Sequence, residues 1–220
     1  MKKISECRLY TFVDTAYLRG KKPAEIAQQL CDGGSDLIQL RAKNSSPQEI
    51  REMADTVLPI TCSAKIPLVI NDHLQIAQEI DAEFCHLGQE DFETLNAERG
   101  TRNISEFKVH NSKLKIGLST HSPAQAERAL AAGADYIAIG PIYATGTKPN
   151  ANPVTLDYVR WAAANVKIPW FAIGGINLEN LADVLAAGAK RICVVAAILN
   201  SGNIRKSCES FREKLERSSS

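Results

Sequence analysis

The 220-residue sequence lacks the patterns that mark several large classes of protein. No apolar run approaches the roughly 20 residues of a membrane-spanning helix. Met1-Lys2-Lys3 is not followed by the apolar core of a secretory signal. The net charge is only +1, without a basic block or a long acidic tail, so neither nucleic acid nor a membrane is indicated as a partner. These absences predict a soluble, cytoplasmic protein.

The six cysteines also lack the spacing of a metal or redox motif. No C-x-x-C pair occurs, and Cys85 and Cys193 lie inside apolar runs, where cysteine behaves as a small hydrophobic residue. Free thiols in a reducing cytosol are therefore expected, in preference to a disulfide framework or a zinc site.

A repeated connection from a helical pattern to a short apolar run indicates how the chain is organised. Segments 31–38, 131–138 and 186–193 each end a helical pattern with glycine, which terminates helices by accepting left-handed geometry, and then enter a short apolar run. The length suits one domain that buries roughly 70% of its unfolded surface. We predict a single domain over residues 1–220, with 218–220 as a frayed tail.

Strand and helix patterns alternate along the chain. Strands are predicted at 9–13, 37–40, 68–70, 84–87, 115–118, 136–139, 170–173 and 192–195. Helices are predicted at 23–30, 47–62, 123–132, 156–164, 178–186 and 203–217. Eight such repeats, with no GxGxxG after the first strand, predict an α/β fold of the (β/α)8 TIM-barrel type in preference to an open sheet. The polar, aperiodic segment 92–113 is expected to be a long loop with one short helix.

The second predicted strand ends in a cluster of polar side chains. Gln39, Arg41 and Lys43 point to one face of an extended chain. Two cations and an amide aimed in one direction suit an anion such as a phosphate. The alternative is a strand that runs out into solvent with ordinary surface charges.

Two carboxylates follow the third and fourth predicted strands. Asp72 comes directly after Asn71, and Asp91 follows His86-Leu87-Gly88-Gln89-Glu90. Oxygen-only ligands beside phosphates suit Mg2+, which binds through one or two carboxylates and keeps several waters. The alternative for Asp72 is an N-cap of the helix that opens at His73.

Later strand ends add further candidates. The loop 140–148 carries glycine, two threonines and Lys148, and can donate several hydrogen bonds to a phosphate; otherwise it is an ordinary surface loop. Gly174-Gly175 precedes a helix that Asn177 could cap, which fits either a phosphate site or a tight turn. His121 could act as an acid or base or be structural, whereas His86 is expected in the core.

Taken together and in order, these residues resemble the thiamin-phosphate synthase family. The resemblance runs from Leu9-Tyr10 to Ile198. It is carried by Gln39-x-Arg41-x-Lys43, Asn71-Asp72, His86-x-Gly88-Gln89-Glu90-Asp91, Ser119, the Gly-Pro-Ile-Tyr loop with Thr145-x-Thr147-Lys148, and Ile173-Gly174-Gly175-Ile176.

The resemblance implies a transferase that joins 4-amino-2-methyl-5-hydroxymethylpyrimidine diphosphate to 4-methyl-5-(2-hydroxyethyl)thiazole phosphate, giving thiamin phosphate and pyrophosphate. It implies Asp72 and Asp91 as Mg2+ ligands, and Arg41, Lys43, Ser119 and Lys148 as catalytic residues. Substrate binding is assigned by the family pattern to Gln39, Leu40, Arg41, Ala42, Lys43, Asn71, Ser119, Thr145, Gly146, Thr147, Lys148, Gly175, Val195 and Ala196.

The sequence departs from the family pattern in three places. Ala42 replaces the usual glutamate, on the face opposite to the Gln-Arg-Lys cluster. Ala196 replaces the common serine, which removes a hydroxyl and predicts weaker binding of the thiazole phosphate. The segment after Asp91 is longer than usual, and the sequence assigns it no function.

Three other functions are compatible with this fold class. A thiazole tautomerase-like isomerase could use His121 as acid or base, but it needs neither a diphosphate clamp nor a metal. A non-catalytic sensor of a phosphorylated ligand would bind without turnover. A phosphosugar isomerase would need a carboxylate-and-histidine base arrangement, which the sequence does not show. Oligomeric state is not indicated.

Overall fold

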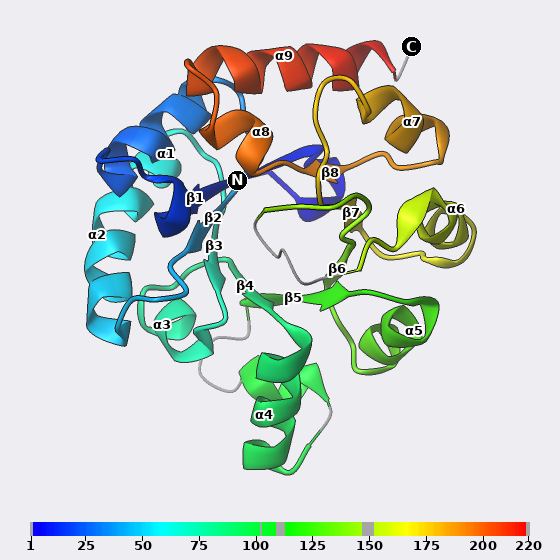
Figure 1. Cartoon of the computed structure of the whole chain (residues 1–220). Coiled ribbons are helices and arrows are strands. Elements are labelled where there is room, and N and C mark those ends of the chain that lie inside the picture. Colours follow the sequence, from blue (N-terminus) through cyan, green and yellow to red (C-terminus); the bar gives the residue numbers. More distant parts are fainter. Residues whose placement is uncertain (1, 102, 109–112, 147–151, 219–220) are drawn as a thin grey trace.

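The computed structural model describes residues 2–101, 103–108, 113–146 and 152–218. Its centre is a closed barrel of parallel strands in the order β1 to β8, seen nearly end-on in Figure 1. The strands are β1 (Leu9–Asp14), β2 (Leu37–Arg41), β3 (Leu68–Asn71), β4 (Phe84–Leu87), β5 (Lys115–Thr120), β6 (Tyr136–Ile139), β7 (Trp170–Ala172) and β8 (Ile192–Cys193).

Helices surround the barrel as an outer ring (Figure 1). They are α1 (Pro23–Asp32), α2 (Pro47–Ser63), α3 (Leu74–Glu79), α4 (Gln89–Arg99), α5 (Pro123–Ala131), α6 (Thr155–Asn165), α7 (Leu181–Ala186), α8 (Ala196–Leu199) and α9 (Ile204–Arg217), with short 3-10 helices at Ile4–Glu6, Thr15–Tyr17 and Ile104–Lys108. Proline opens α1, α2 and α5, where its missing N–H costs no helical hydrogen bond. No helix within the described ranges is long and apolar enough to cross a membrane.

The predicted (β/α)8 TIM barrel is confirmed, and each predicted strand lies within two residues of an observed one. The loop prediction for 92–113 was wrong in its first part, because α4 covers Gln89–Arg99 and a 3-10 helix covers Ile104–Lys108. Polar residues fill most of α4, so no apolar stripe marked it. The last strand ends at Cys193, two residues early, because the backbone turns at Val195 to enter α8.

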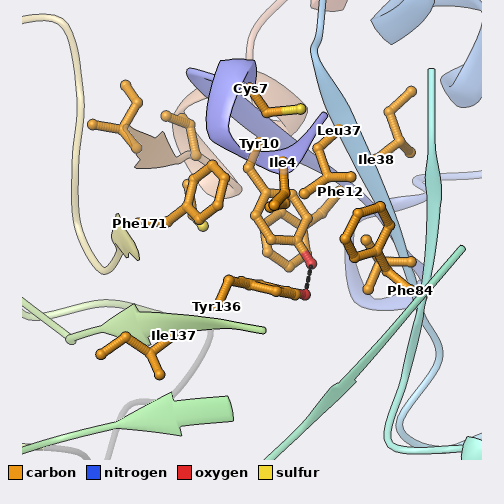
Figure 2. Close-up of a cluster of buried hydrophobic side chains, with 14 of the residues drawn as sticks. Ile4, Cys7, Tyr10, Phe12, Leu37, Ile38, Phe84, Tyr136, Ile137 and Phe171 are labelled. Carbon is orange, nitrogen blue, oxygen red and sulfur yellow. Dashed lines mark hydrogen bonds between the residues drawn. The ribbon is translucent and has the colours of Figure 1, made fainter. Parts of the chain in front are cut away.

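Aromatic side chains fill the inside of the barrel. Tyr10, Tyr136 and Phe171 are fully buried and pack edge to face (Figure 2). Their ring centroids lie 5.3 to 6.4 Å apart. The Tyr136 ring lies over Gly117 of β5, where an added Cβ would come within 2.1 Å of it. Glycine at this position therefore makes room for the aromatic cluster.

Candidate active site

A cavity of about 420 Å3 opens at the end of the barrel where the strands finish. This is the end at which TIM barrels carry their sites. Its lining includes eleven of the predicted site residues: Gln39, Arg41, Lys43, Asn71, Asp72, Ser119, Thr145, Gly146, Gly175, Val195 and Ala196. Side chains from widely separated parts of the sequence thus meet in one place, because parallel strands end at the same edge.

The alternation predicted for β2 is present. Gln39, Arg41 and Lys43 line the cavity, whereas Leu40 and Ala42 are buried and do not contribute to its lining. The strand register places Asp14 opposite Arg41. The Arg41 guanidinium donates one hydrogen bond to Asp14 at 2.8 Å, and both side chains are largely withdrawn from solvent. Asp14 thereby fixes the direction of Arg41.

Lys43 forms the second ion pair of the site, with Asp72 at 3.0 Å. Asp72 also accepts hydrogen bonds from the Asn71 amide and from the backbone N–H of Gly88. It does not cap the following helix, since the N-cap of α3 is His73, without a capping bond from a side chain. The capping alternative for Asp72 is thus wrong, and its carboxylate faces the site.

Asp91 approaches Asp72 from the first turn of α4. Gly88 allows this approach, because a Cβ there would lie 2.6 Å from the Asp91 carboxylate. Burial alone would raise the pKa of Asp72, but hydrogen bonding and charge from Lys43 outweigh burial and lower it. Burial, and then the negative charge of Asp72, raise the pKa of Asp91. The two carboxylates therefore repel each other, and a cation bound between them would reduce this repulsion.

This donor set fits a magnesium ion that shares its coordination with a substrate. The described residues contain no cluster of three or more His, Cys, Asp or Glu side chains with metal-site geometry. Mg2+ needs no such cage, since it takes one or two carboxylates and fills its other positions with water and phosphate oxygens. Asp72 and Asp91 supply oxygen donors only, which is the chemistry that Mg2+ prefers.

A chain of hydrogen bonds crosses the floor of the cavity. The Gln39 amide donates to the Tyr10 hydroxyl at 2.5 Å, and the hydroxyls of Tyr10 and Tyr136 lie 3.4 Å apart (Figure 2). His86 joins this chain to Ser119, with Nδ1 3.2 Å from the Tyr136 hydroxyl and Nε2 3.0 Å from Ser119 Oγ. His86 is buried, as predicted from its apolar strand, and it also orients a predicted substrate contact.

The opposite wall of the cavity is built from loops. Thr145, Gly146 and Gly175 lie there with Val195 and Ala196, which precede or open the short helix α8. Thr147 and Lys148 lie outside the described residues. Asn177 accepts hydrogen bonds from two following backbone N–H groups, but the N-cap of α7 is Asn180, so the capping expectation for Asn177 was wrong.

Some lining residues were not expected from the sequence, among them Tyr10 and Phe12, which point inward from β1. His121, which the sequence offered as a candidate at the end of the fifth strand, also joins the lining, and its Nδ1 contacts the carbonyl oxygen of Gly140. Asp14 was missed because the first strand was predicted to stop at Val13. The rule that polar residues at strand ends point to the site would have found it.

Comparison with known proteins agrees with this geometry. A family model described as "Thiamine monophosphate synthase" matches residues 9–198. A thiamine-phosphate synthase of Halalkalibacterium halodurans is 37% identical over 95% of each chain, and one of Lawsonia intracellularis is 37% identical over 94% of this chain and 92% of its own. A solved thiamine phosphate pyrophosphorylase from Pyrococcus furiosus superposes with a TM-score of 0.84 at 29% identity, over 98% of both chains. The chain belongs to the thiamine monophosphate synthase family.

Proposed function

We propose that this chain is a transferase that makes thiamin phosphate. It would join 4-amino-2-methyl-5-hydroxymethylpyrimidine diphosphate to 4-methyl-5-(2-hydroxyethyl)thiazole phosphate. The carbon–oxygen bond to the diphosphate breaks, a bond from that carbon to the thiazole nitrogen forms, and pyrophosphate leaves. The observation that carries the proposal is the meeting of two cations, Arg41 and Lys43, with the Asp72–Asp91 pair at one side of the cavity.

The pyrimidine diphosphate would occupy the side formed by β2 to β5. Gln39 and Ser119 present hydrogen-bonding groups near the floor, and Arg41, Lys43 and Asn71 stand at the rim. The backbone of Leu40 and Ala42 would complete this side. The thiazole phosphate would lie against Thr145, Gly146, Gly175, Val195 and Ala196, together with Thr147 from outside the described residues.

Asp72 and Asp91 would hold one Mg2+ through their oxygens. The bound ion would supply positive charge to the diphosphate, as fixed cations commonly do in transfers of phosphorylated groups. Their mutual repulsion and the raised pKa of Asp91 support this assignment. Lys43 would hold Asp72 ionised before the substrate arrives, because its ammonium group lies 3.0 Å from that carboxylate.

Catalysis would then depend on positive charges that the folded chain holds in position before the reaction. Negative charge grows on the leaving oxygen, where Arg41, Lys43 and Lys148 would stabilise it; such preorganised charges are worth several kcal/mol. The aminopyrimidine can stabilise the cation that remains, so loss of pyrophosphate first and attack by the thiazole nitrogen second is the expected order. That nitrogen loses no proton, so no residue needs to act as a general base.

The cytoplasm is the expected compartment. All six cysteines lie within the described residues and are free, as suits a reducing environment. The tautomerase, sensor and phosphosugar isomerase alternatives gain no support from the relatives reported above, which are named as synthases or pyrophosphorylases.

The first experiment is a direct assay of the purified protein. Both substrates and Mg2+ are mixed with it, and thiamin phosphate is followed by thiochrome fluorescence, with EDTA as the metal control. Metal-dependent product is expected. Absence of product, with folded protein and intact substrates, would contradict the proposal and favour the sensor or the isomerase.

A further inference from the structure

The turn that follows β7 carries a polar side chain to which the proposed function gives no role. Asn177 lines the cavity of the candidate active site, shortly after Gly175, where the thiazole phosphate is proposed to lie. Within the described chain, Thr145 and Asn177 are the residues of this wall that have an oxygen or nitrogen atom in the side chain. Ala196 offers none, although the family commonly has serine there. Asn177 is therefore a candidate for the side-chain donor that this wall lacks at Ala196.

The turn itself fixes the orientation of the Asn177 amide. Its Oδ1 accepts hydrogen bonds from the backbone N–H groups of Glu179 at 2.8 Å and Asn180 at 3.0 Å. A flipped amide would place the NH2 group of Asn177 against these two N–H donors, so the positions of its oxygen and nitrogen are determined. The oxygen is thus occupied within the turn, and the nitrogen lies on the other branch of the amide.

The amide nitrogen of Asn177 is available to a ligand. Nδ2 donates no hydrogen bond to another residue of the described ranges. It is also open to solvent, because the unpaired side-chain atoms that are sealed from solvent in the described chain belong to Glu83, Asn96 and Arg191. Its two N–H groups can therefore donate to a molecule in the cavity that Asn177 lines.

A second amide, that of Asn180, holds the turn in place. Its Nδ2 donates to the carbonyl oxygen of Gly175 at 2.9 Å, and its Oδ1 accepts from the backbone N–H of Asn177 at 2.9 Å. A trans peptide directs its C=O and N–H to opposite sides, so the Ile176 N–H points away from Asn180. The N–H groups of Gly175 and Ile176 donate to no group of the described residues. The turn thus offers backbone and side-chain N–H groups together, a set that suits an anionic ligand.

We propose that Asn177 is a substrate-binding residue whose Nδ2 donates to the phosphate of the thiazole substrate. It makes this wall of the cavity selective for the phosphorylated ligand over the free alcohol. The choice of ligand rests on the proposed function. Hydrogen bonds to a charged acceptor are stronger than those between neutral groups, so loss of this donor should weaken binding of the phosphorylated ligand by roughly tenfold or more.

The test titrates the full chain with thiamin phosphate and with thiamin by isothermal titration calorimetry. The two ligands differ only in the phosphate. Asn177→Asp keeps the oxygen that accepts from Glu179 and Asn180, but replaces the NH2 group by an oxygen that shares a negative charge. It should bind thiamin phosphate roughly tenfold or more weakly than the wild type, and thiamin no more weakly. Asn103→Asp is the matched control and should leave both affinities unchanged, because Asn103 Oδ1 also accepts from a backbone N–H two residues on, at an exposed position outside the cavity.

Two further measurements separate a contact with phosphate from an effect on the turn. Asn177→Ser can still accept the backbone N–H groups through its hydroxyl, and it should weaken thiamin phosphate binding without adding a charge. In the turnover assay, Asn177→Asp should raise KM for the thiazole phosphate and leave KM for the pyrimidine diphosphate unchanged. An equal loss of affinity for thiamin and thiamin phosphate, or no loss for either, would overturn the inference. A wild type that shows this Asn177-dependent preference but makes no thiamin phosphate would overturn the proposed function and leave the inference standing.

Discussion

The ion pair between Arg41 and Asp14 allows a prediction that separates stability from catalysis. Arg41→Ala removes a proposed phosphate ligand and also leaves the Asp14 carboxylate buried without its partner. At 2.8 Å and an effective dielectric constant of about 20, the attraction between the two charges is about 6 kcal/mol. Desolvation offsets much of it, and breaking a buried pair by removing one partner costs about 3–5 kcal/mol.

The lower end of that range applies here. Asp14 keeps one hydrogen bond, from the backbone N–H of Ala16 at 3.0 Å. We expect Arg41→Ala to lower the free energy of unfolding by about 3 kcal/mol. For a chain of this size that corresponds to a fall of about 6–12 °C in Tm. Turnover of folded protein should fall at least tenfold, about 1.4 kcal/mol of transition-state stabilisation.

Urea unfolding and initial rates measure the two effects separately. Asp14→Asn in the Arg41→Ala background should recover part of the stability, because it removes the stranded charge, but none of the activity. Arg51→Ala is the matched control: its ion pair with Asp55 is exposed, and its loss should change stability by less than about 0.5 kcal/mol. An Arg41→Ala protein as stable as the wild type would refute the role assigned to the pair.

Three further perturbations test other parts of the structure. Asp91→Asn should shift the Mg2+ titration of turnover to higher concentration, and an unchanged titration would remove Asp91 as a ligand. Because the pKa of Asp91 is raised in the folded chain, its protonation adds stability as the pH falls through that raised pKa toward the ordinary pKa of an aspartate, and this stability is lost again as the pH rises. Asp91→Asn should abolish this part of the pH profile of urea unfolding. Gly117→Ala should cost about 1–3 kcal/mol in urea unfolding through its clash with Tyr136, whereas Gly202→Ala, which meets no atom within 4 Å, should not. Ellman's reagent at pH 8 should label Cys62 first, since it is exposed while burial raises the pKa of Cys31 to about 11; an equally fast reaction of Cys62→Ser would contradict this order.

The barrel was predictable because its signals are local. Glycine after an alanine-rich helix and short apolar runs mark each repeat, and the carboxyl ends of parallel strands must share an edge. Arg41, Lys43 and Asp72 could therefore be assigned to one site before any geometry was known. That α4 was missed has an equally local cause, since a polar helix on the rim shows no apolar periodicity.

What could not be predicted depends on neighbours that are distant in sequence. Nothing near Tyr10 or Tyr136 shows that their hydroxyls meet inside the barrel, 126 positions apart in sequence. Asn96 is similar, because its amide becomes buried and unpaired only when the chain is folded. The effect of Ala196 on thiazole phosphate, and the extent of the single domain, stay predictions.

The hydrogen-bond chain under the cavity has a direction. The Gln39 amide nitrogen can only donate, so the Tyr10 hydroxyl accepts from it and can use its own O–H to donate to the Tyr136 hydroxyl. Tyr136 in turn donates to His86 Nδ1, which places the imidazole proton on Nε2, facing Ser119 Oγ. Ser119 is then left with its hydroxyl proton to offer. Gln39 on β2 thus determines that Ser119 on β5 acts as a hydrogen-bond donor toward a substrate. A ligand that places an acceptor lone pair next to the Ser119 hydroxyl is therefore favoured.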